Sequence, residues 1–120
     1  MDEGAPHEER RKCPRVFLDL PIEYRVTDAP YAHGGLVVNA SEMGLLINSV
    51  KDILIGSRLN ITVLFPKGFE LTNFEVSAEI IWKDRCWKED WEGYRYGLRF
   101  IEILEEDRRK LKRLLNSRYP

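Results

Sequence analysis

The 120-residue sequence has little of the chemistry on which most enzymes and metal sites depend. Its two histidines, His7 and His33, fall in segments that read as tail and loop. No nucleophile motif, acid–base pair or cluster of metal ligands accompanies them. We therefore expect a protein that is not an enzyme and has no cofactor or metal.

Long apolar runs are also missing, and none approaches the length of a transmembrane helix. Residues 1–15 are polar and have no apolar segment of the kind found in signal peptides. We expect a cytoplasmic protein without membrane insertion, and reduced thiols at Cys13 and Cys86. Cys13 lies among basic residues that would favour its thiolate, although an exposed, unreactive thiol is the simpler interpretation.

An excess of one charge is absent as well, since the formal net charge is −1. The molecule as a whole is therefore not a general polyanion binder, and an anion site has to be local. Basic and aromatic residues are not interleaved on one strand, which disfavours a small nucleic-acid-binding barrel of the OB or SH3-like type.

Alternation of apolar and polar residues dominates what is present. Each of six segments alternates with period two or forms a short apolar run, as β-strands do. These segments are 18–26, 36–38, 45–47, 59–65, 74–82 and 94–100. The charged stretch 83–93, which contains Trp87 and Trp91, reads as a loop. The pattern predicts an all-β fold, a six-stranded antiparallel β-barrel whose closure removes exposed strand edges.

The C-terminal segment changes period. Residues 105–117 read as a helix with acidic residues first, basic residues later and a leucine stripe that would cap or flank the barrel. The expected organisation is a flexible tail (1–9) and one domain (10–120). That domain has an arginine arm (10–15), a barrel (16–103) and the C-terminal helix.

Two short motifs stand out. Arg11 and Arg15 form R-x-x-x-R, with Arg10 beside them, just before the first strand. Guanidinium forks suit phosphates and the O6/N7 edge of guanine. Residues 39–44 read N-x-S-x-x-G between two short strands, where Asn39 and Ser41 offer an amide and a hydroxyl. Gly44 would allow a positive φ or a close backbone approach. Separately, each motif is typical of a basic tail or a plain turn.

Together, and in this order, the motifs resemble those of the PilZ domain family. That family carries R-x-x-x-R and [D/N]-x-S-x-x-G on a six-stranded barrel with a C-terminal helix. Residues 78–82 and 96–100 resemble its last two strands, and the resemblance extends over roughly residues 8 to 117. Asn39 stands where the family more often has aspartate.

The resemblance implies a receptor for cyclic di-GMP. Arg10, Arg11 and Arg15 would contact its phosphates and guanines, Asn39 and Ser41 would hold a guanine, and Gly44 would shape the turn. Ligand binding would draw the arginine arm onto the barrel and so alter a surface for a separate effector protein, not yet identified. Whether one ligand binds or an intercalated pair stays open.

The tryptophans leave alternatives open. Trp82 matches a position near the guanine in some family members, but its spacing from Ile80 equally suits the core or the barrel rim. Trp87 and Trp91 are partner contacts or pack over the barrel end. An alternative function is a protein-interaction scaffold of the same fold that acts independently of the nucleotide.

Overall fold

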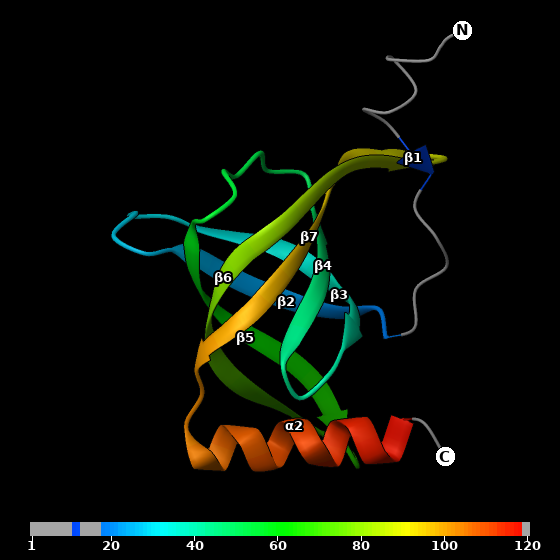
Figure 1. The fold of residues 1–120 in the computed structure, drawn as a ribbon. Coiled ribbons are helices and arrows are strands. Elements are labelled where there is room, and N and C mark those ends of the chain that lie inside the picture. Colours follow the sequence, from blue (N-terminus) through cyan, green and yellow to red (C-terminus); the bar gives the residue numbers. More distant parts are fainter. Residues whose placement is uncertain (1–10, 13–17, 119–120) are drawn as a thin grey trace, which may run out of the picture.

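The computed structural model describes residues 11–12 and 18–118 of the chain. Seven strands precede one helix in this part of the molecule (Figure 1). The strands are β1 (Arg11–Lys12), β2 (Leu20–Val26), β3 (Ala32–Ala40), β4 (Gly44–Ser49), β5 (Arg58–Lys67), β6 (Glu70–Lys88) and β7 (Trp91–Glu102). The helix is α2 (Glu105–Arg118).

Strands β2 to β7 form a closed ring. The hydrogen-bonded order is β6-β5-β2-β3-β4-β7, and a further pairing of β6 with β7 joins the two ends. Every pairing within the ring is antiparallel. The predicted six-stranded antiparallel fold with a C-terminal helix is thus confirmed. The two-residue strand β1 lies outside the ring and pairs in parallel with β6.

The core occupies the inside of this ring, because apolar residues alternate along the strands as the sequence predicts. In β5, Leu59, Ile61, Val63 and Phe65 are buried, and their neighbours point outward. The leucines of α2 complete the core: Leu111 and Leu114 are buried against it. Burial of this apolar surface is the main stabilising contribution to the fold.

Two tyrosines place hydroxyl groups inside the core, and both find partners. The Tyr96 hydroxyl donates to the Lys51 carbonyl at 2.6 Å and accepts from the Ile53 amide at 2.8 Å. The Tyr24 hydroxyl lies 2.6 Å from Ser49 Oγ. Burial raises the pKa of both tyrosines. Tyr96 therefore fastens the segment between β4 and β5 to the barrel.

The prediction of a loop over residues 83–93 is wrong. Strand β6 continues to Lys88, β7 begins at Trp91, and Glu89 and Asp90 alone form the turn between them. Charged residues occur on both faces of this extension, so it lacks the alternation that marks a half-buried strand. Figure 1 shows the paired strands continuing past the rest of the barrel, with β1 beside their end.

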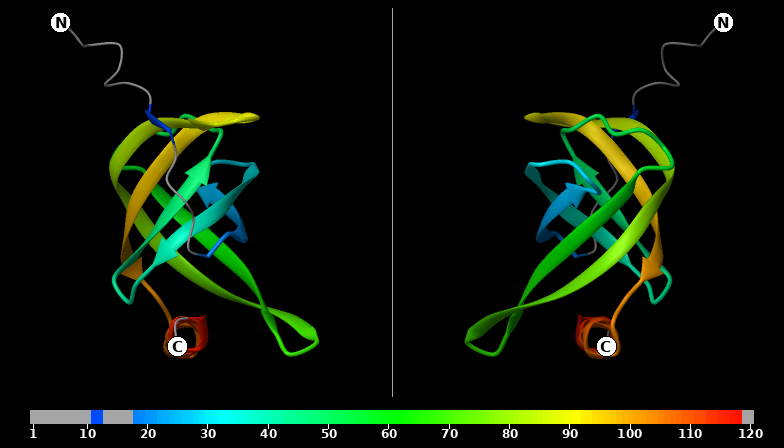
Figure 2. Two further views of the ribbon diagram at one scale, coloured as in Figure 1. Left: turned by 90° about the vertical axis from the view of Figure 1, so that its right-hand side faces the viewer. Right: turned by 90° about the vertical axis from the view of Figure 1, so that its left-hand side faces the viewer.

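Helix α2 lies across one end of the barrel (Figures 1 and 2). Acidic residues fill its first turn, where their negative charges interact favourably with the positive end of the helix dipole. Lys110 Nζ donates to the Asn73 carbonyl at 3.0 Å, which ties the helix to β6. Within the described residues, no helix is long and apolar enough to span a membrane.

Candidate ligand-binding site

The turn between β3 and β4 is held by its own polar side chains. Asn39 Oδ1 accepts from the Ala40 amide at 2.8 Å, and Ser41 Oγ accepts from the Met43 amide at 3.1 Å. The Ser41 amide donates to the Gly44 carbonyl at 3.0 Å. Such local bonds are the reason these residue types favour turns. The Asn39 and Ser41 side chains remain exposed and available to a ligand.

Gly44 is required for close approach rather than for a positive φ. A Cβ at Gly44 would lie 2.0 Å from the Leu98 carbonyl oxygen, which is far inside van der Waals contact. The missing side chain lets the turn rest directly on β7, where the Phe100 amide donates to the Met43 carbonyl at 3.0 Å. The turn is consequently fixed to the barrel wall.

Two β-bulges redirect site residues to the outer face of the barrel. The register shifts between Val37 and Asn39, and again between Ile80 and Trp82. Without a shift, a residue two positions after a core residue would also face the core. Val37 and Ile80 are fully buried, whereas Asn39 is exposed and Trp82 is 43% exposed. Trp82 is therefore a surface residue and not part of the core.

The bulges align Asn39 and Trp82 in one row across four strands. Asn39 pairs with Leu46, Leu46 with Gly97, and Gly97 with Trp82. Three strand spacings put the two ends about 14 Å apart along this row. A Cβ at Gly97 would lie 3.2 Å from Trp82 Cβ, so the base of the tryptophan lies over the glycine. We call these four residues the outer row.

A cleft of about 520 Å³ opens beside the outer row. Besides three members of that row, it is lined by the turn and by neighbouring residues of β6 and β7. The further lining residues are Ala40, Ser41, Met43, Gly44, Leu45, Ile81, Leu98 and Arg99. Arg99 Nη2 donates to Glu79 Oε1 on β6, and its side chain remains 57% exposed. The cleft thus combines an apolar floor with an amide, a hydroxyl and a guanidinium.

Of the predicted arginine motif, the backbone of Arg11 lies within the described residues. Arg10 and Arg15 lie outside the described residues. The backbone of Arg11 pairs with Cys86 on β6, four residues beyond Trp82. Asn39, Ser41, Gly44 and the outer row, in contrast, form one continuous surface.

Cys86 differs from the expectation of reduced thiols. It is buried and disulfide-bonded in the structure, and it lies opposite Arg11 in the parallel pairing of β1 with β6. The second cysteine of the sequence, Cys13, lies outside the described residues. The prediction of a reduced Cys86 is therefore wrong for this structure.

The other two tryptophans have different surroundings. Trp91 is half-buried, and its ring lies so close to Gly93 that an added Cβ there would be 2.7 Å from it. Trp91 therefore packs beside Gly93 of its own strand. Trp87 remains 37% exposed.

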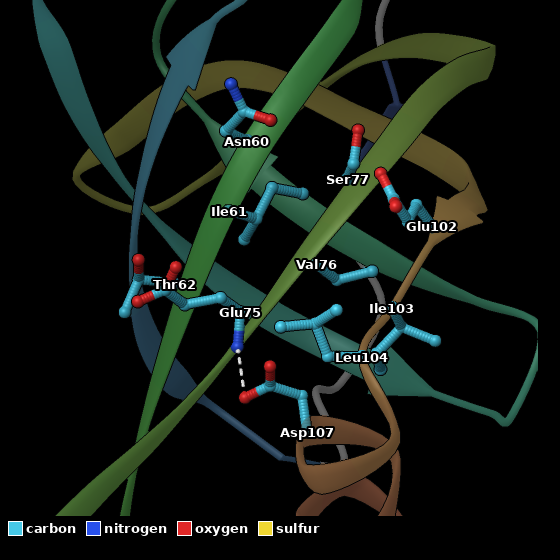
Figure 3. Close-up of a pocket in the computed structure, with 10 residues that line it drawn as sticks. All are labelled: Asn60, Ile61, Thr62, Glu75, Val76, Ser77, Glu102, Ile103, Leu104 and Asp107. Atoms are coloured by element: carbon cyan, nitrogen blue, oxygen red, sulfur yellow. Dashed lines mark hydrogen bonds between the residues drawn. The ribbon is translucent and has the colours of Figure 1, made fainter.

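A second hollow has the opposite electrostatic character. A groove of about 320 Å³ lies where β5 and β6 meet the start of α2 (Figure 3). Its described lining includes the carboxylates of Glu75, Glu102 and Asp107 and no basic side chain. Asp107 Oδ1 accepts from the Glu75 amide at 3.1 Å, as the dashed line in Figure 3 shows. Among the described residues, no group of three or more His, Cys, Asp or Glu is arranged to hold a metal ion.

The sequence motifs did not include four residues that complete the cleft. Leu46, Ile81, Gly97 and Arg99 lie on strands and belong to neither motif. A signal for Gly97 was present, because a glycine inside a strand often marks a close approach of another group. Arg99 follows it two positions later and so shares its outward face.

Comparison with known proteins places this geometry in a family. The family model of the PilZ domain matches residues 9–117. The fold is similar to the structure of the Bacillus subtilis inhibitor of motility, MotI/DgrA, with a TM-score of 0.65 and 17% identity over 86% of this chain. It is also similar to the PilZ domain of YcgR from Escherichia coli, solved with c-di-GMP, with a TM-score of 0.64 and 17% identity over 82% of this chain.

The match spans 50% of the MotI/DgrA chain and 80% of the YcgR chain. No curated protein matches the sequence. At 17% identity the two solved structures support the fold. The family model, however, spans nearly all of the sequence, and the chain belongs to the PilZ domain family.

Proposed function

We propose that this protein is a cyclic di-GMP-binding regulatory module and not an enzyme. The observation that carries the proposal is the position of Asn39 and Ser41 beside a cleft of about 520 Å³ with an apolar floor. Membership of the PilZ domain family, and the c-di-GMP in the YcgR structure, support the choice of ligand.

The cleft has the chemistry for a purine base. Leu46, Ile81 and Gly97 offer an apolar floor. Trp82 lies beside Gly97 and is 43% exposed. Aromatic and apolar surfaces stack on bases, while amides and hydroxyls bind their polar edges. In this proposal Asn39 and Ser41 hold one guanine, Gly44 keeps the turn in place, and Trp82 flanks the base.

The arginine arm would supply the charge for the phosphates. The described lining of the cleft has one charged side chain, Arg99, and Glu79 binds it. A dianionic ligand needs additional cations. Arg11 lies in β1, which pairs with β6, and Arg10 and Arg15 flank β1 in the sequence. Arginine forks bind phosphate in a bidentate manner, which makes these residues suitable partners.

Signalling would follow from a change in this arm. If the ligand draws Arg10, Arg11 and Arg15 onto the barrel, the surface presented to a separate effector protein changes. The ligand drives such a change only by binding one arrangement of the arm better than the other. We place this event in the cytoplasm, where a disulfide such as that of Cys86 is rare.

Titration calorimetry with cyclic di-GMP tests the proposal. We expect saturable binding by the parent protein and at least roughly tenfold weaker binding after Arg15→Ala or Ser41→Ala, since each removes a polar ligand contact. Arg109→Ala is the matched control, because Arg109 is an exposed helix arginine paired with Glu105. The fitted stoichiometry distinguishes one ligand from an intercalated pair. No saturation at high micromolar ligand would rule the proposal out.

The alternative function is an interaction scaffold that acts without the nucleotide. The hairpin of β5 and β6 projects from the barrel (Figure 2), and Phe69 and Leu71 at its tip are exposed. Exposed apolar residues in such a place suit a protein contact. Capture of the same partner with and without cyclic di-GMP, lost on Phe69→Ser, would favour this function.

A further inference from the structure

Arg99 is placed to contact whatever occupies the cleft. It pairs with Gly44 on β4 and with Glu79 on β6. It lies two residues after Gly97, which is the member of the outer row on β7. Gly44, its partner on the turn side, has no side chain. Among the described lining residues, Arg99 alone carries a charge.

Glu79 changes what Arg99 offers. Their ion pair is partly exposed, so it adds little to stability. It does bring the local charge close to zero, and it holds the guanidinium through Nη2. The remaining N–H groups still donate hydrogen bonds. A guanidinium that is already paired with a carboxylate suits the uncharged acceptor edge of a base better than it suits a phosphate. A phosphate is bound more strongly by an unpaired cation.

We propose that Arg99, oriented by Glu79, donates to the O6/N7 edge of a guanine in the cleft and makes the site select guanine over adenine. This inference rests on the proposed function, because it concerns the base of the same ligand. Guanine presents two acceptors on this edge, which match an arginine fork. Adenine presents an amino donor in place of O6, so the fork meets a donor and loses one bond.

Asn39 cannot supply this discrimination alone. Its Oδ1 already accepts from the Ala40 amide, so its amino group is the part that remains free of that bond. It also lies at the far end of the outer row from Trp82. Asn39 and Arg99 would therefore read different edges of the base from different strands.

The test compares affinities for cyclic di-GMP and cyclic di-AMP in the full chain and three variants. Arg99→Lys keeps the charge and removes the fork. We expect it to weaken cyclic di-GMP binding roughly 10- to 100-fold and to change cyclic di-AMP binding less than about twofold, so that the preference for guanine largely disappears. Glu79→Gln should reduce the preference by a smaller factor, because the fork is still present but less constrained. Arg109→Ala should leave both affinities unchanged.

The salt dependence distinguishes a base contact from a phosphate contact. We expect the loss caused by Arg99→Lys to be the same at low and high salt. Wild-type binding by Arg99→Lys, or a loss that appears only at low salt, would assign Arg99 to a phosphate and overturn the inference. A wild-type protein that binds no cyclic di-GMP would overturn the proposed function as well. Equal urea midpoints show that each variant is folded.

Discussion

The cleft beside the β3–β4 turn and the groove beside α2 both include residues of β6 and β7, yet they suit different partners. The cleft combines an amide, a hydroxyl and an arginine with an apolar floor, whereas the groove has three carboxylates and, among the residues that the structure describes, no basic lining residue. No described residue lines both. The fold alone therefore does not determine which surface binds a ligand. The side chains on each stretch of strand determine it.

The origin of the difference is local. Two bulges and two glycines shape the cleft, while the groove follows from the way a helix meets a sheet. Bulges turn Asn39 and Trp82 outward, and the missing side chains of Gly44 and Gly97 lower its floor. The groove depends instead on the contact of Asp107 with the Glu75 amide. Each of these features provides a way to test the comparison.

Gly44→Ala has the largest expected effect, because it disrupts the cleft and not the groove. The new Cβ would lie 2.0 Å from the Leu98 carbonyl oxygen, so the turn has to lift from β7. We expect the free energy of unfolding to fall by about 3 kcal/mol and ligand binding to be lost. Urea unfolding and calorimetry measure the two effects.

Gly34→Ala is the control for that substitution. Its nearest neighbour would be 3.9 Å away, so stability should stay the same or rise slightly. A Gly44→Ala protein as stable as the wild type would show that the turn does not depend on this approach.

Tyr96→Phe tests whether the core beneath the cleft can be weakened without changing the cleft. The substitution leaves the Ile53 amide without its acceptor, and we expect a loss of about 1–3 kcal/mol in the free energy of unfolding. Ligand affinity at pH 7 should not change, because Tyr96 faces inward and Gly97 and Arg99 face outward. Tyr31→Phe, at an exposed tyrosine, is the control.

The same tyrosine gives a pH dependence. Burial raises the pKa of Tyr96 and of Tyr24 above the ordinary value of 10.0. Above that value the unfolded chain releases its tyrosine protons before the folded protein does. The contribution of these tyrosines to the free energy of unfolding is therefore fully present below pH 10.0 and is lost as the pH rises further. Tyr96→Phe should show a shallower decline than the wild type in urea titrations between neutral pH and about pH 11. Equal slopes would contradict this assignment.

These cases show what sequence patterns reveal about the molecule. The barrel was predictable because alternation in β5 and β6 is strong, and the C-terminal helix because its charges and leucines change period. The outward positions of Asn39 and Trp82 were not predictable, since each lies two residues after a core residue and a bulge cannot be located from alternation alone. The extension of β6 and β7 was missed for a related reason, because charged residues occupy both of its faces.

Gly97→Ala should have a smaller effect that is confined to the cleft. Its Cβ would lie 3.2 Å from Trp82 Cβ, which requires a shift of a few tenths of an ångström and raises the floor of the cleft. We expect ligand binding to weaken roughly fivefold to tenfold, with stability changed by less than about 1 kcal/mol. Ser77→Ala, in the groove, should leave the affinity unchanged. If both variants bind like the wild type, the ligand does not lie over Gly97.

Asp107→Ala should have the smallest effect, and it addresses the groove. The variant loses the bond to the Glu75 amide and a negative charge in the first turn of α2, which together are worth about 0.5–1 kcal/mol of unfolding free energy. Asp107→Asn retains an oxygen that can accept from Glu75 and removes only the charge, so it should lose less. Amide exchange at Glu75 should become faster in the alanine variant alone. Cyclic di-GMP affinity should stay within about twofold in both, because Asp107 lines the groove and not the cleft. A marked change in affinity would mean that the two regions are coupled through β6 and β7, and the separation drawn between them would then be wrong.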